Sequence, residues 1–160
     1  MKRILLTDRK NFAAFAARLT LGIVVFAHGA QKLFGWFGGY GFEGTMGWLT
    51  IQQNVPWIIA FLVIIIESIG ALALIAGFAT RIFAFLVFCN FVGIIANTHL
   101  RNGFFMNWNM IPDQPEGYEY HLLVLGLSIV LMITGGGKWS IDAALNRSAD
   151  YAYDKDTVVA

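Results

Sequence analysis

The chain has 160 residues, of which 58% are hydrophobic and only 13% are charged, and its formal net charge is +1. Soluble domains are usually about 45–50% apolar and about a quarter charged, so this chain carries more apolar surface than such a domain buries. The near-neutral charge gives no reason to expect nucleic acid as a partner. A single cysteine, Cys89, excludes an intrachain disulfide and any CxxC redox or metal motif. The composition therefore predicts an integral membrane protein whose main partner is the lipid bilayer.

Four segments meet the requirement of roughly 17–25 mainly apolar residues for a transmembrane helix. In chain order they are residues 12–36, 57–77, 81–100 and 119–136. The first segment also fits a secretory signal peptide, because basic residues precede its apolar centre and small residues follow it. Its apolar character resumes after Lys32, however, which favours a retained span. We therefore expect an all-α membrane protein, a bundle of four transmembrane helices.

The basic residues predict the orientation of the bundle, since cytoplasmic loops carry an excess of Lys and Arg. Basic residues cluster before and at the start of the first segment and return after the fourth, whereas the connection at 38–56 has none. An even number of spans places both ends of the chain on the same side. We therefore expect both termini in the cytoplasm.

The connections comprise one tight turn and two longer outer loops. Residues 78–80 leave room only for a tight turn, so the second and third helices should be antiparallel neighbours. Each outer loop, at 38–56 and 101–118, is expected to contain a short interfacial helix, the first at about 45–54. The expected organisation is a basic cytoplasmic N-terminus, a transmembrane domain and a flexible cytoplasmic tail, at residues 1–11, 12–145 and 146–160.

Charged residues inside the hydrocarbon region are costly unless paired, so each one is a candidate functional residue. Glu67 lies ten residues from either end of its segment, about 15 Å along a helix, and therefore near the midplane. It should point into the bundle toward His28, Lys32 or an asparagine. Polar residues of all four helices fall mainly in the outer half, where they would form a pocket. The candidate ligand-binding residues are His28, Lys32, Glu67, Asn97 and His121.

Each candidate also has a purely structural explanation. Lys32 can extend its side chain to the outer interface, and Asn97 can hydrogen-bond between helices. His121 lies near a helix end, where solvated polar residues are ordinary, and Glu67 can serve helix packing alone. The chain contains no HExxH pair, phosphate loop or nucleophile elbow, so we predict no metal site.

Two blocks of the chain resemble the signature of DoxX-type membrane proteins. The first is HGAQKLFG at residues 28–35 followed by GFEGT at 41–45, and the second is GGKWSID at 136–142. The resemblance covers residues 13–145 and implies a small four-helix inner-membrane protein of bacteria or archaea that keeps its first helix. The family name derives from a subunit associated with thiosulfate and quinone oxidoreduction, so the resemblance also implies a component of an oxidoreductase system.

The sequence is compatible with three functions. The first is an accessory membrane subunit of an oxidoreductase system that binds quinone or another lipophilic small molecule in the polar pocket. Electron transfer would then need a partner subunit or the bound quinone, because no redox cysteine pair or obvious haem ligand is present. The second is a structural or scaffolding subunit. The third is a small transporter or proton channel that uses Glu67, which for four short helices without a visible repeat would require a homo-oligomer.

Overall fold

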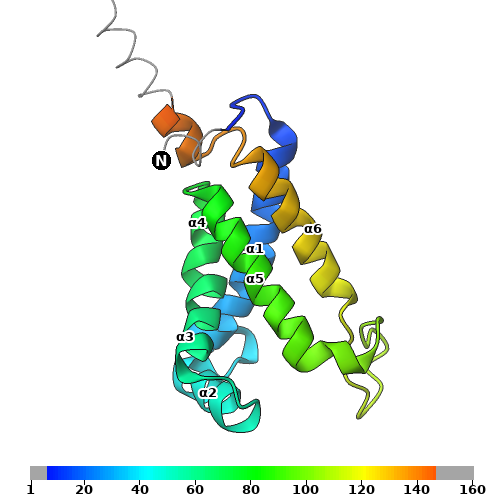
Figure 1. Cartoon of the computed structure of the whole chain (residues 1–160). Helices are drawn as coiled ribbons and strands as arrows, with labels where there is room; N and C mark the ends of the chain where they lie inside the picture. Colours follow the sequence, from blue (N-terminus) through cyan, green and yellow to red (C-terminus); the bar gives the residue numbers. More distant parts are fainter. Residues whose placement is uncertain (1–6, 147–160) are drawn as a thin grey trace, which may run out of the picture.

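The computed structural model describes residues 7–146, and every regular element among them is helical. Three long rods and one shorter helix, α6 (Glu119–Thr134), stand side by side (Figure 1). The first rod is α1 (Phe12–Phe34). The second rod consists of α3 (Trp57–Ile65), η4 (Ile66–Gly70) and α4 (Ala71–Ala76). The third rod consists of α5 (Thr80–Ile94), η5 (Ile95–His99) and η6 (Leu100–Asn102).

All three rods are long and apolar enough to cross a membrane. The 16 residues of α6 give a length of about 24 Å, which is shorter than the roughly 30 Å hydrocarbon core of a bilayer. The all-α fold class is therefore confirmed for the described residues. Three of the four expected spans have the length and composition of a membrane helix, and the fourth is a shorter apolar helix. The expected tail at 146–160 lies, apart from its first residue, outside the described residues.

The ends of the rods follow from local backbone chemistry. The side chain of Asn11 accepts a hydrogen bond from the backbone N–H of Ala14 at 2.9 Å and so caps the start of α1. Gly35 ends α1 in the left-handed conformation, with φ of 74°, which costs glycine little because it has no Cβ. Gly77 ends α4 in the same way, with φ of 69°. Ala79 is also left-handed, and the expected tight turn at 78–80 is confirmed.

Glycines on α1 let the first and second rods approach closely. A Cβ on Gly29 would lie 2.1 Å from the carbonyl oxygen of Glu67, and one on Gly22 would lie 2.6 Å from Cγ1 of Ile75. Small residues permit such backbone contact between membrane helices. The apolar core lies alongside this contact, where residues from all four helices pack together: Leu21, Val25, Ala71, Leu74, Ala84, Val87, Phe91, Val124 and Leu131.

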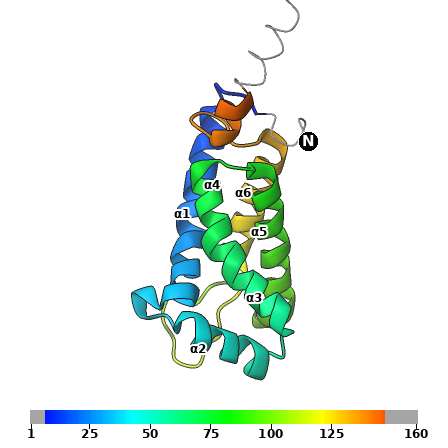
Figure 2. The ribbon, with the colours of Figure 1, turned by 90° about the vertical axis from the view of Figure 1, so that its left-hand side faces the viewer.

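Figure 2 shows that the connections gather at two ends of the bundle, which we call the turn end and the loop end. The turn end holds the turn between α4 and α5 and the segment after α6, including a short helix at 141–146. The loop end holds the loop at 35–56 and the loop at 103–118.

A buried arginine holds the turn end together. Arg18, only 1% exposed, donates hydrogen bonds to the carbonyl groups of Gly136 and Trp139, both at 2.8 Å, and to that of Ile75. The carboxylate of Asp142 accepts hydrogen bonds from the backbone N–H groups of Ala79 and Thr80 at 2.8 and 2.9 Å. These contacts fix the segment after α6 to the ends of α4 and α5.

The two loops at the loop end differ. The first contains α2 (Gly41–Gly47) and η3 (Trp48–Gln52), so the expected helix is present and begins earlier than predicted. The second helix was expected in the loop at 101–118, and that prediction is wrong for residues 103–118, which form turns. The side chain of Asn107 bonds there to the backbone N–H and C=O of Ile111 and to the C=O of Gln114. Two prolines, Pro112 and Pro115, also lack the N–H that a helix requires.

Candidate functional site

A cavity of about 560 Å³ lies in the half of the bundle nearer the loop end, and all five predicted site residues line it. His28 and Lys32 reach it from α1, Glu67 from η4, Asn97 from η5 and His121 from α6. Residues of α3 and α5 form its sides, and parts of both loops border it at the loop end. The sequence predicts that these residues converge in one pocket, and the structure brings them together there.

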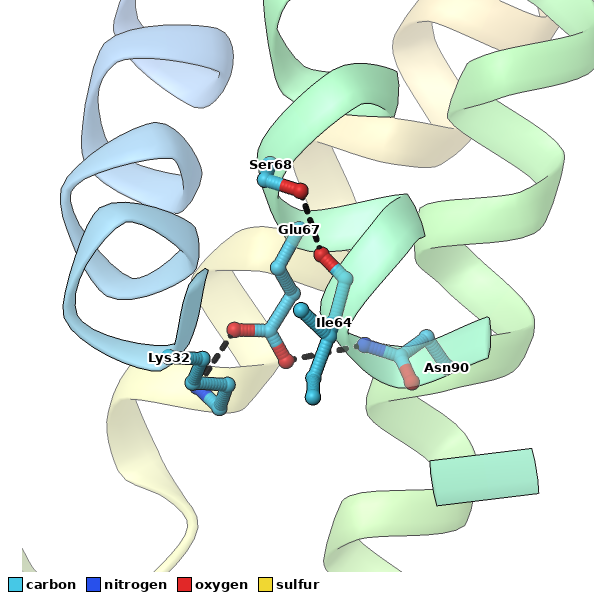
Figure 3. Close-up of polar contacts among 5 residues, drawn as sticks. All are labelled: Lys32, Ile64, Glu67, Ser68 and Asn90. Atoms are coloured by element: carbon cyan, nitrogen blue, oxygen red, sulfur yellow. Dashed lines mark hydrogen bonds and ion pairs between the residues drawn. The ribbon is translucent and has the colours of Figure 1, made fainter. Parts of the chain in front are cut away.

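Glu67 occupies the polar centre of this cavity. Its side chain is 1% exposed and points between α1 and α5 (Figure 3). Oε2 accepts a hydrogen bond from Nζ of Lys32 at 2.5 Å, and Oε1 accepts one from Nδ2 of Asn90 at 3.0 Å. Both carboxylate oxygens therefore have a partner. The predicted inward orientation of Glu67 is confirmed, with Lys32 and an asparagine as its partners.

Glu67 lies in a π-helical segment, and so does Asn97. A π-turn opens the helix by one residue relative to the α-helix and occurs often at functional sites. In η4 the hydroxyl of Ser68 bonds to the carbonyl oxygen of Ile64 at 2.6 Å and so satisfies a backbone group inside the rod. The third π-helical segment, η3, contributes Trp48 and Leu49 to the cavity wall. All three π-helical segments among the described residues thus border the cavity.

Lys32 does not simply extend to solvent. Its ammonium group is held against Glu67, and its side chain is 27% exposed. An ammonium group placed between a carboxylate and a cavity can also donate to an acceptor inside that cavity, since it has three donors. Lys32 therefore forms the ion pair with Glu67 and also lines the cavity.

Three histidines and a tyrosine form a second polar cluster in the cavity. The ring centroids of His99 and His121 lie 4.3 Å apart, and those of His28 and Tyr120 lie 5.7 Å apart. His121 is 6% exposed, and its Nδ1 has no hydrogen-bond partner in the described part of the chain. The hydroxyl of Tyr120 is also buried and has no hydrogen-bond partner among the described residues. Buried polar atoms normally have partners, so these two point to a group absent from the chain itself.

Asn90 and Asn97 both line the cavity from the third rod, and only Asn97 belongs to the predicted set of ligand-binding residues. Asn97 was a predicted ligand residue with an interhelical hydrogen bond as its alternative, and it lines the cavity as an exposed residue. Asn90 was outside the predicted set, yet it bonds to Glu67. The available signal was the polar stripe of Asn90, Gly93 and Asn97 at i, i+3 and i+7, since all three line the cavity.

The side walls of the cavity are more apolar and more exposed than its centre. Ile59 and Val63 of α3 face it, as do Cys89 and Gly93 of α5. Ile59 is 48% exposed, and Cys89 and Gly93 are also exposed. The cavity therefore combines an exposed apolar side with a buried polar end. Across residues 7–146, no group of three His, Cys, Asp or Glu side chains is arranged to hold a metal ion.

Comparison with known proteins gives the family. The profile of the DoxX family matches residues 13–100, which is more than half of the chain. The chain is also 30% identical over 125 residues to a Bacillus subtilis (strain 168) protein named "Putative oxidoreductase CatD", a match that covers 78% of this chain and 81% of that protein. No solved structure matches the chain. With its three long apolar rods, the chain is a multi-pass membrane protein that belongs to the DoxX family.

Proposed function

We propose that the chain is an accessory membrane subunit of an oxidoreductase system and that it binds a quinone, or another lipophilic molecule with a carbonyl-bearing head group, in the cavity. The observation that carries this proposal is the juxtaposition of Glu67, Lys32 and the unpartnered Nδ1 of His121 in one largely apolar cavity. Ligand pockets typically have 300–1,000 Å³, apolar walls and a few convergent polar groups. The cavity, at about 560 Å³, has these properties.

The polar groups suit a head group with carbonyl oxygens. The Lys32 ammonium and the Tyr120 hydroxyl are donors, and Nδ1 of His121 is a donor or an acceptor depending on its tautomer. The chain's one cysteine, Cys89, cannot form an internal disulfide. Electrons for a bound quinone would therefore come from a partner subunit that carries a redox centre, while this chain binds and orients the ligand.

We further propose that all four helices span a bacterial inner membrane, with both termini in the cytoplasm. Arg18, Arg81 and Lys138 lie toward the turn end, whereas residues 38–56 at the loop end contain no Lys or Arg. The excess of basic residues supports a cytoplasmic turn end. The shorter α6 is accommodated by local thinning of the bilayer, which costs a fraction of a kcal/mol per Å of mismatch.

The proposal is tested by equilibrium binding of a ubiquinone analogue to purified protein in lipid nanodiscs. Glu67→Ala and His121→Ala should each weaken binding roughly tenfold, because each removes a polar group of the head-group end. Glu43→Ala is the matched control, since Glu43 is an exposed carboxylate on α2 that does not line the cavity. Unchanged affinity in both cavity variants would reject the proposal.

The same preparations separate the two other candidate functions. A scaffolding subunit would bind no quinone, would tolerate Glu67→Gln and would lose a co-purifying partner when lipid-facing residues are changed. A transporter or proton channel that uses Glu67 would produce a flux in proteoliposomes above that of empty vesicles. Absence of binding together with such a flux would favour the channel.

A further inference from the structure

Two parallel stripes of residues form the exposed side of the cavity. On the second rod Ile59, Val63 and Glu67 follow one another at intervals of four residues, and on the third rod Cys89, Gly93 and Asn97 do the same. All six line the cavity. Residues four apart lie on the same face of a helix, so the two stripes face each other across the cavity.

The two rods separate toward the loop end. Figure 1 shows α5 beside α4 near the turn end and diverging from α3 below it. A hydrogen bond from Asn90 to Glu67 links the two rods. On the loop-end side of that bond the exposed residues Ile59 and Gly93 lie in the cavity wall, and the exposed Cys89 lines the cavity next to Asn90 in the chain. The cavity therefore opens sideways between α3 and α5, on a flank of the bundle that faces lipid when the rods span a bilayer.

The far end of the cavity is polar and buried. His121, which is 6% exposed, leaves Nδ1 without a partner there, and the Tyr120 hydroxyl is also unpartnered among the described residues. A bound molecule that matches the polar end and the apolar opening of the cavity has a hydrogen-bonding head group near α6. Its apolar chain lies in the opening between α3 and α5.

We infer that the cavity takes an amphiphile directly from the bilayer through the opening between α3 and α5, with the head group entering first. This inference rests on the proposed function and narrows its ligand to a quinone with an isoprenoid or alkyl chain. Transfer of apolar chain into water costs about 0.8 kcal/mol per CH₂, so a long-chain ligand avoids the aqueous route. A lateral opening keeps the chain in hydrocarbon throughout binding.

Two glycines provide a matched test of the opening. A Cβ on Gly93 or on Gly126 would meet nothing within 4 Å, so a side chain at either position starts in open space. Gly93 lines the cavity on α5, whereas Gly126 is exposed on α6 and does not line it. Gly93→Trp narrows the opening, and Gly126→Trp controls for a tryptophan on a lipid-facing surface. Ile59→Trp and its exposed neighbour variant Ile58→Trp repeat the test on the opposite wall.

The measurement compares the association rates of a long-chain ubiquinone and of its tail-less analogue with each variant in nanodiscs. Gly93→Trp and Ile59→Trp should slow association of the long-chain ligand roughly tenfold relative to their controls and leave that of the tail-less analogue within about threefold of wild type. Equal slowing of both ligands, or no slowing of either, would overturn the lateral route while leaving the proposed function intact. Failure of the wild type to bind either ligand would overturn the proposed function itself.

Discussion

The ammonium group of Lys32 lies 2.5 Å from Oε2 of Glu67 and so joins the loop end of α1 to the π-helical centre of the second rod. The Glu67 side chain is 1% exposed and that of Lys32 is 27% exposed. Removing one member of a buried pair leaves an uncompensated charge, which costs more than the intact pair gains. The pair therefore couples the position of α1 to the geometry of the cavity.

Lys32→Met should destabilise the protein by about 2–3 kcal/mol, a value below the 3–5 kcal/mol of fully buried pairs because Lys32 is partly exposed. Glu67→Gln should cost less, since the amide oxygen of the introduced glutamine still accepts from Asn90. The double variant Lys32→Met/Glu67→Gln should be more stable than Lys32→Met alone, because no unpaired carboxylate is left. Denaturation in detergent micelles measures the free energies of unfolding of the wild type and the three variants. Additive effects would show that the two groups are not coupled.

Gly29→Ala should disturb both packing and binding. Its methyl group would meet the backbone of Glu67 at 2.1 Å, so α1 must move away from η4. We expect a destabilisation of about 1–3 kcal/mol, as for other overpacking substitutions, together with weaker quinone binding. Gly126→Ala is the control, because its methyl group enters open space. Equal stability and affinity of the two variants would contradict the close contact between α1 and η4.

Much of the fold is predictable from hydropathy because the rods are continuous apolar segments. The predicted bounds differ by at most two residues from those of the helical rods and α6, and α1 ends before position 36 because Gly35 adopts the left-handed conformation. The hydrogen-bond partners of Glu67 are harder to predict from the sequence. A pattern with a period of 3.6 residues does not reveal the π-helical segment at Ile66–Gly70, which alters the direction of the following side chains.

The role of Arg18 shows a second limit of sequence-based prediction. Arg18 looks like a residue that marks a membrane interface, yet it is buried. Its partners are carbonyl groups of α4 and of residues 136–139, and no side-chain pattern encodes backbone acceptors that come together only in the folded chain. The turns at 103–118 are held in a similar way, since the side chains of Asn107, Glu116 and Glu119 accept hydrogen bonds from backbone N–H groups within this loop.

Asp142→Asn should destabilise the turn end without changing the ligand site. The carboxylate accepts from two backbone N–H groups, and an amide can accept with only one of its two atoms, so one buried donor loses its partner. The expected cost is about 1–3 kcal/mol, with quinone affinity unchanged because Asp142 does not line the cavity. Asp113→Asn in the exposed loop serves as the control. Equal stability of the two variants would contradict the hydrogen bonds from the backbone N–H groups of Ala79 and Thr80 to Asp142.

The proposed topology predicts which ends are accessible from outside the cell. In a Cys89→Ser background, Gln114→Cys places a thiol in the loop end and Leu145→Cys places one at the turn end, and both positions are exposed. A membrane-impermeant maleimide should label Gln114→Cys in intact spheroplasts and should label Leu145→Cys only after permeabilisation. The reverse pattern would place the termini outside the cytoplasm. Labelling of both sites in intact spheroplasts would contradict a topology in which the loop end and the turn end lie on opposite sides of the membrane.

The central claim is that the cavity binds a quinone, and Cys89 offers the most direct test of it. This residue is the chain's one cysteine, is exposed and lines the cavity. The test measures its labelling rate by a lipid-soluble maleimide in nanodiscs, with and without a quinone at about five times its dissociation constant for the wild type. All ring carbons of this quinone are substituted, so it cannot add a thiol. The bound ligand should slow labelling about fivefold in the wild type, because it covers the thiol, and the protection should fall below about twofold in His121→Ala at the same ligand concentration. An unchanged labelling rate in the wild type would contradict binding in this cavity.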